Sequence, residues 1–245
     1  MLTSSDCLTP EWQAPSNVRT LVTTRRGGVS EPPYDSLNVG IAVGDHPEAV
    51  AENRARLTAL LPGAPRWLRQ VHGNAVVEAD DVTVPVEADG AFTRTPGVVC
   101  VVQMADCMPV LFAADDGSVV AAAHAGWRGL ASGILENTIG ALNIEPRRLH
   151  AWLGPAIGPA RFEVGDEVRE AFMAQSADAA SAFTAHAQGK WLADLFLLAR
   201  QRLRRAGVGH ISASGLCTVS DPTRFFSHRR DRISGRMAAA IWIDR

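Results

Sequence analysis

The sequence predicts a mixed α/β protein that forms one domain over residues 1–245. Short apolar runs rich in β-branched residues predict strands, and longer amphipathic segments between some of them predict helices. Some predicted strands follow one another after a few residues, as in hairpins, whereas others are separated by a helix, as in parallel crossovers. We therefore expect mixed β-sheets flanked by helices, and a layered α-β-β-α sandwich is one such arrangement.

The first part of the chain combines a strand, a long loop and a helix. Residues 18–24 carry β-branched residues in weak alternation, which predicts a strand. Residues 25–40 are dense in Gly, Pro, Ser and Asn and predict a long loop, a feature that often serves function. A helix is predicted over 46–61, because Asp45 and Glu48 have the spacing of a capping box.

The rest of the chain alternates between apolar strands and amphipathic helices. The later strands are predicted at 67–72, 75–79, 98–104, 109–113, 118–124, 149–153, 211–218 and 237–243. The later helices are predicted at 129–142, 165–175 and 191–206, the last of which ends near Gly207. No internal repeat or low-complexity tract interrupts this series, which is why we expect a single domain.

The composition is that of an ordinary soluble globular protein. Hydrophobic residues make up 47% of the chain and charged residues 20%, and the formal net charge is −2. This charge provides no global attraction to nucleic acid or to an anionic membrane. Because the sequence also shows neither a signal-peptide pattern nor an apolar run long enough to span a membrane, we expect a cytoplasmic protein. We expect it to be a monomer or homodimer that binds neither nucleic acid nor membrane.

Three residues that can bind a metal stand at or beside the ends of predicted strands. They are His72 in WLRQVHGNAVV, Cys107 in VVQMADCMPVLF and His124 in VVAAAHAGWRG. Neighbouring strands lie about 5 Å apart, so side chains at strand ends can converge. Two imidazoles and a thiolate suit zinc, and three protein ligands leave a fourth position for water or substrate, as in catalytic sites.

The spacing of these residues also permits other interpretations. It matches none of the compact zinc signatures, and a histidine after an apolar strand or a single cysteine is commonly structural. Alternatively, Cys107 is a nucleophile with His72 or His124 as its base. Asp106 would then orient a histidine, or it would act as an acid or base beside a metal.

Five motifs occur in an order that resembles a known family. They are QVHG (70–73), ADCMPVLF (105–112), AAAHAGWRG (121–129), WLGPAIGPARFEVG (152–165) and FFSHRRD with the following GR (225–236). Together they resemble the family labelled multicopper polyphenol oxidase or laccase domain, which includes the bacterial peptidoglycan editing factor. The resemblance runs from TTRRGGVS (23–30) to AAAIWI (238–243), nearly the whole chain.

The resemblance implies a zinc site and a set of activities. The zinc ligands of the family fall on His72, Cys107 and His124. Members are described as purine nucleoside phosphorylases that cleave adenosine, inosine, guanosine and methylthioadenosine with phosphate to the free base and (methylthio)ribose 1-phosphate. They are also described as deaminating adenosine to inosine, and the editing-factor relative implies a role in peptidoglycan editing.

The laccase label disagrees with the residues themselves. A multicopper oxidase needs many imidazoles, typically as HxH pairs, together with a blue-copper site. This chain has seven histidines, and no two of them are two positions apart. We therefore reject laccase as the physiological activity, although a His-Cys-His site can take up copper in vitro.

Further residues are candidates for catalysis and substrate binding. Trp127 would stack on a purine or act as a structural wedge, and Arg128 would bind phosphate at a helix start or form an ion pair. Arg25 is a second phosphate candidate or an exposed loop arginine, and Asn38 would bind base or ribose or stabilise a turn. Besides Cys107 and His124, the catalytic candidate is Asp106, as a proton shuttle in deamination.

Two other classes of function compete with the phosphorylase. The first is a metal-independent cysteine hydrolase acting on cell-wall precursors, which chelation would spare and thiol alkylation would inactivate. The second is a non-enzymatic partner in peptidoglycan synthesis, for which variants of the three ligand residues would keep the cellular phenotype.

Overall fold

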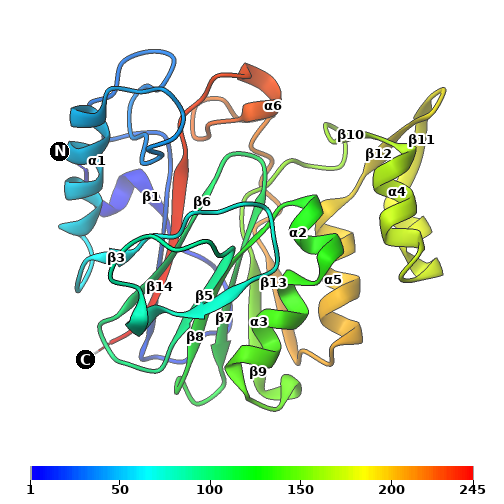
Figure 1. The fold of residues 1–245 in the computed structure, drawn as a ribbon, viewed down its shortest axis with the longest axis horizontal. Coiled ribbons are helices and arrows are strands. Elements are labelled where there is room, and N and C mark those ends of the chain that lie inside the picture. Colours follow the sequence, from blue (N-terminus) through cyan, green and yellow to red (C-terminus); the bar gives the residue numbers. More distant parts are fainter. Residues whose placement is uncertain (1, 245) are drawn as a thin grey trace.

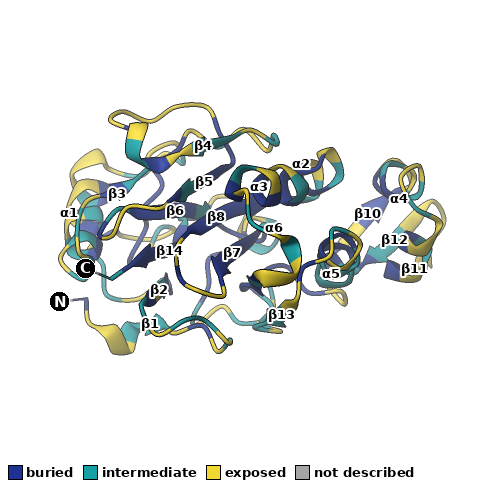
Figure 2. Ribbon diagram, turned by 90° about the horizontal axis from the view of Figure 1, so that it is seen from below, coloured by how far each residue is buried: buried dark blue, intermediate teal, exposed yellow. Residues whose placement is uncertain are grey.

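Two β-sheets pack face to face, and helices cover their outer sides (Figure 1). The computed structural model describes residues 2–244. One apolar cluster lies between the sheets, and two others lie between a sheet and its helices. The prediction of mixed sheets flanked by helices is therefore confirmed, in the form of an α-β-β-α sandwich. Figure 2 shows the central strands of both sheets as buried, with most exposed residues on outer helices and loops.

The first sheet is mixed and has the order β1-β2-β14-β6-β3. All its pairs are antiparallel except β3 with β6. Helix α1 (Pro47–Thr58) covers its outer face, where Leu57 is fully buried. The strands are β1 (Cys7–Leu8), β2 (Val18–Thr23), β14 (Met237–Ile243), β6 (Val99–Met104) and β3 (Pro65–Arg66).

The second sheet is also mixed and has the order β13-β9-β7-β8-β5-β4. Its outer pairs, β13 with β9 and β4 with β5, are parallel, and the inner pairs are antiparallel. The strands are β13 (His210–Ala213), β9 (Leu149–Leu153), β7 (Met108–Ala114), β8 (Val120–Ala125), β5 (Gly90–Thr93) and β4 (Val76–Glu78). The covering helices are α2 (Trp127–Ser132), α3 (Ile134–Leu142) and α5 (Leu195–Arg205).

A small third sheet with the order β10-β12-β11 lies beside α4, at the right of Figure 1. Its strands are β10 (Glu163–Gly165), β12 (Lys190–Ala193) and β11 (Phe183–Ala187), and α4 is Asp166–Met173. The remaining short helices are α6 (His228–Asp231), η1 (Ser4–Asp6), η2 (Ala79–Asp81), η3 (Pro146–Arg148) and η4 (Ala177–Ala182). No helix of residues 2–244 combines the length and apolar character needed to cross a membrane.

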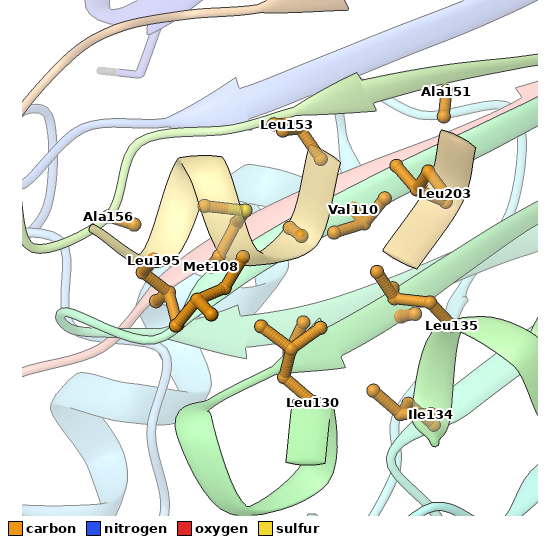
Figure 3. Close-up of a cluster of buried hydrophobic side chains, with 14 of the residues drawn as sticks. Met108, Val110, Leu130, Ile134, Leu135, Ala151, Leu153, Ala156, Leu195 and Leu203 are labelled. Atoms are coloured by element: carbon orange, nitrogen blue, oxygen red, sulfur yellow. The ribbon is translucent and has the colours of Figure 1, made fainter. Parts of the chain in front are cut away.

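The central strands read as continuous apolar runs because both of their faces are covered. In β7, Val110 and Phe112 face the helices, whereas Leu111 and Ala113 face the other sheet. Figure 3 shows Val110 packed with Leu135 and neighbouring side chains in the layer between the second sheet and its helices. In β8, side chains alternate between the two faces of the strand. His124 lies on the same face as Val120 and Ala122, the face toward the first sheet.

Several predicted elements differ from the structure. The prediction of a strand over 67–72 was wrong. The segment forms only one isolated β-bridge, between Arg69 and Glu87, because side-chain hydrogen bonds and not a series of backbone hydrogen bonds hold it in place. The helix predicted over 129–142 divides at Gly133, which has a φ of 99°. The helix predicted over 191–206 begins only at Leu195, since the preceding residues form β12.

Other differences concern strand ends and capping. The strand predicted over 211–218 ends at Ala213, and the sequence did not predict β5 or the small sheet. The capping-box prediction was wrong as well. The Asp45 carboxylate accepts hydrogen bonds from Ser30 and Asn38, at 2.6 and 2.9 Å, and thereby ties the long loop together instead of capping α1.

Candidate metal centre and cavity

Three chain segments bring His72, Cys107 and His124 together. His72 lies in the loop before β4, Cys107 in the turn from β6 to β7, and His124 in β8. Their potential ligand atoms all lie within 4.8 Å of one another. The two imidazole rings are 4.9 Å apart between centroids and meet at 74°, edge to face. The convergence predicted from the sequence is therefore present, and these residues can hold one metal ion.

The backbone around this cluster adopts unusual conformations. His72 and Asp106 have positive φ values of 61° and 84°, and Arg232, which lines the same cavity, has 64°. Non-glycine residues rarely take such values, and those that do occur often at functional sites. Gly126 supplies the space next to the cluster, because a Cβ atom there would lie 2.8 Å from the Cys107 sulfur.

Side chains fix the segment that carries His72. The Gln70 side chain donates to the Gln103 carbonyl at 2.9 Å and accepts from the Gln103 amide at 2.7 Å. This exchange imitates a strand pair and attaches the segment to β6. The cluster is thus connected to regular structure although His72 itself lies in a loop.

Asp89 is a site residue that sequence reasoning missed. It is fully buried just before β5, and its carboxylate lies 2.8 Å from Nδ1 of His124. The same carboxylate accepts the backbone amides of Val71, His72 and Gly73, at 3.1, 3.0 and 2.8 Å. Nothing in the local sequence indicates this burial, because it arises from the packing of separate segments.

The cluster is electrostatically coupled in the metal-free protein. Burial by itself would raise the pKa of the Cys107 thiol, but the charge of His124 and hydrogen bonds from both histidines lower this pKa to about 6. Burial would lower the pKa of His124, but the Cys107 thiolate and Asp89 raise it to about 9. Each member of this pair therefore stabilises the charged form of the other.

A cavity of about 640 Å³ contains the cluster in its wall. Asp106 is the one carboxylate among the described lining residues, and Glu87 pairs with Arg69 at 2.9 Å, so the cavity keeps an excess of positive charge. Such a cavity favours an anionic ligand. Trp67, Trp127 and Phe162 add aromatic surface. The lining arginines are Arg54, Arg69, Arg128, Arg229, Arg232 and Arg236.

Two of the predicted substrate residues line this cavity. Trp127 and Arg128 are the first residues of α2, directly after the His124 strand. The Arg128 guanidinium lies 4.4 Å above the Trp127 ring. No ion pair joins Arg128 to another residue of the described range, so the structure lends no support to the alternative of a structural ion pair. The Arg128 charge is thus free to meet an anion.

Arg25 and Asn38 are not among the described residues that line the cavity. Arg25 donates to the carbonyls of Asp35 and Pro222 and to the Asp35 carboxylate. The buried Asn38 side chain bonds to both backbone groups of Gly40, to Asp45 and to the Arg236 amide. Both residues therefore organise the long loop, and the geometry favours the structural alternative for each.

Asp106 lines the cavity, but its carboxylate is already engaged. It accepts the hydroxyls of Thr218 and Ser227 at 2.6 and 3.0 Å and the Arg229 amide at 2.7 Å. These bonds anchor the turn that carries Cys107 to the segment around α6. The geometry therefore favours an anchoring role for Asp106 next to the cluster.

The fold and the cluster define an α/β protein with a candidate single-metal centre in a basic cavity. The chain belongs to the family described as multi-copper polyphenol oxidoreductase laccase, whose sequence profile matches residues 19–244. The family resemblance predicted from the motifs is confirmed.

Similar proteins match over almost the whole chain. The purine nucleoside phosphorylase PA4543 of Pseudomonas aeruginosa is 53% identical over 237 residues, which cover 96% of this chain and 98% of that protein. The purine nucleoside phosphorylase YfiH of Escherichia coli is 51% identical over 242 residues, covering 98% and 99%. The crystal structure of Neisseria meningitidis protein NMB0706 aligns with a TM-score of 0.96 at 48% identity, covering 98% of this chain and 100% of that one.

Proposed function

We propose that this chain is a zinc-dependent purine nucleoside phosphorylase in the cytoplasm. It cleaves adenosine, inosine, guanosine and methylthioadenosine with phosphate. The observation that carries the proposal is the His72, Cys107 and His124 cluster in the wall of a cavity rich in arginine. Relatives named purine nucleoside phosphorylase, 51% and 53% identical over nearly their whole lengths, support the same activity.

The donor set fits zinc. Two imidazole nitrogens and one sulfur within 4.8 Å suit a small divalent ion of borderline softness, and three protein ligands are typical of catalytic zinc. Gly126 leaves room beside the sulfur. When bound, zinc supplies a Lewis acid, the chemistry required for the second proposed activity, deamination of adenosine to inosine.

The cavity offers contacts for both substrates of phosphorolysis, the phosphate and the purine nucleoside. In this reaction a phosphate oxygen forms a bond to C1′ of the ribose as the bond from C1′ to the purine nitrogen breaks, and the departing base takes a proton. Arg128, whose guanidinium forms no ion pair with the described residues, binds and orients the phosphate. Trp127 supplies a stacking surface for the purine.

The copper centres implied by the family description fit this chain less well than a single zinc ion does. Among residues 2–244 a single group of three or more metal-binding side chains can share an ion. A multicopper oxidase needs several such groups. Copper uptake by this one site in vitro is compatible with the donor set.

One observation favours a second candidate, a metal-independent cysteine hydrolase acting on cell-wall precursors. Cys107, His124 and Asp89 form a nucleophile, base and orienting carboxylate in series, with 2.8 Å between His124 and Asp89. The lowered pKa of the thiol, about 6, suits a nucleophile. This candidate differs from the first in its response to metal removal.

The test is metal analysis of protein purified without chelator, followed by a panel of nucleosides with and without phosphate. The expected result is about one zinc per chain and phosphate-dependent release of base and ribose 1-phosphate. Chelation and the Cys107→Ala substitution should both abolish this release. Hydrolysis of a cell-wall precursor peptide that survives complete removal of metal and is lost on alkylation would support the hydrolase instead.

A further inference from the structure

We propose that Asp89 is a positioning residue that sets both histidines of the metal centre before any metal binds. This inference rests on the proposed metal function and adds to it a residue that contacts neither substrate nor metal. Asp89 is fully buried, and four hydrogen bonds converge on its two carboxylate oxygens.

Asp89 fixes the ring of His124. Its Oδ1 atom lies 2.8 Å from Nδ1 of that ring, so Nδ1 carries the proton and Nε2 is left as the ligand atom. The Asp89 carbonyl also accepts the His124 amide at 2.7 Å. Ring and backbone of His124 are therefore held by the same residue.

Asp89 fixes His72 in a different manner, through the main chain. Three successive amides, from Val71 to Gly73, point at its carboxylate and form a nest around it. His72 has a φ of 61° at the centre of this nest, a conformation that costs free energy unless other contacts hold it. The carboxylate supplies those contacts, so the strained backbone that aims His72 depends on Asp89.

The decisive variant is Asp89→Asn, which keeps one acceptor oxygen but presents an amide group where a second acceptor is required. Loss of a carboxylate that hydrogen-bonds to a metal-binding histidine lowers metal affinity about 10- to 100-fold. The matched control is Asp80→Asn, because the Asp80 carboxylate accepts the Thr93 hydroxyl at 2.6 Å, at the far end of β5. The control should lower stability without changing zinc affinity.

Zinc affinity is measured by competition with a chromophoric chelator, and ligand geometry by the absorption spectrum of the cobalt(II)-substituted protein. The expected result is weakened zinc binding and an altered cobalt spectrum in Asp89→Asn alone. Parental affinity and spectrum in a folded Asp89→Asn protein would overturn the proposal. Neither readout involves a nucleoside, so failure of the phosphorylase proposal would leave this test intact.

A second measurement uses the unsubstituted chain, in case Asp89→Asn does not fold. In metal-free protein, hydrogen exchange at the amides of residues 71–73 should already be slow, because Asp89 accepts them without metal. Fast exchange that becomes slow only on addition of zinc would show that the metal, and not Asp89, orders the segment. That outcome would overturn the proposal.

Discussion

A Cβ atom on Gly126 would lie 2.8 Å from the Sγ atom of Cys107. It would also lie 3.1 Å from Cδ2 of His72, so the absent side chain of Gly126 is space that two ligands require. The φ of Gly126 is −65°, which any residue adopts. The requirement for glycine is therefore one of volume and not of backbone conformation.

Replacement of Gly126 by alanine should displace the ligands. Overpacking of this kind costs about 1–3 kcal/mol, so we expect zinc affinity to fall about tenfold to a hundredfold. Chelator competition measures the change. The control is Gly140→Ala on α3, where an added Cβ meets nothing within 4 Å. That variant should keep its zinc affinity and gain about 1 kcal/mol in unfolding free energy. Equal zinc affinities in both variants would contradict the steric argument.

Cys107 should react faster than Cys7 and Cys100 in the metal-free protein at pH 7. Its pKa of about 6 keeps it largely ionised, whereas burial and then the charge of Asp6 raise the pKa of Cys7 to about 11. Burial also raises the pKa of Cys100. Peptide mapping after brief iodoacetamide treatment should find Cys107 modified before Cys7 and Cys100, and added zinc should protect Cys107. Modification of Cys107 at the same rate with zinc present would argue against sulfur ligation.

Zinc binding should strengthen as pH rises. In the metal-free protein His124, with a pKa of about 9, stays protonated at neutral pH and must lose that proton to bind a metal. Between pH 6 and pH 9 the association constant should rise about tenfold per pH unit. Below pH 6 Cys107 must lose a proton too, so the dependence becomes steeper. Calorimetry in buffers of different ionisation enthalpy gives the number of protons released, and zero at pH 7.5 would contradict the imidazolium.

Arg128→Ala should weaken phosphate use. A hydrogen bond to a charged group contributes about 1.5–3 kcal/mol, so the KM for phosphate should rise about 10- to 100-fold. The comparison variant is Arg205→Ala, an exposed arginine at the end of α5 outside the cavity lining. Initial rates at varied phosphate and fixed inosine measure both. An unchanged KM in Arg128→Ala would remove this residue from the phosphate site.

Asp106→Ala should destabilise the fold, because it leaves three donors without their acceptor. We expect a loss of about 3 kcal/mol in unfolding free energy, measured by urea denaturation. Asp106→Asn keeps an acceptor oxygen and separates anchoring from proton transfer. If Asp106 only anchors, the pH profile of adenosine deamination keeps its shape in this variant. Loss of one limb of the profile would support the proton-shuttle prediction.

The central strands could be predicted from sequence because burial on both faces produces unmistakable apolar runs. The strands predicted at 149–153 and 237–243 have those bounds in the structure. The small sheet could not be predicted, since its β11 is exposed from Thr184 to Ala187 and lacks an apolar pattern. Gly133 divides a helical pattern that the sequence alone presents as continuous.

The site could be predicted only in part for a similar reason. His72, Cys107 and His124 could be predicted to converge because metal-binding side chains stand out beside apolar runs, although His72 lies in a loop and not at the end of a strand. Asp89 was not visible, because its role comes entirely from segments that meet in the folded chain. The composition of the loop points to Arg25 as a phosphate candidate, but its hydrogen bonds to Asp35 depend on the folded path of the loop and cannot be predicted from spacing.

Cys107 occupies the connection between β6, a strand of the first sheet, and β7, a strand of the second. His124 belongs to the second sheet, and Gln70 binds the His72 segment to β6. An ion ligated by all three side chains is thus a crosslink between the two layers that resists shear of one past the other. Loss of the ion would therefore loosen the packing of the two sheets at this end of the sandwich, in addition to any effect on catalysis.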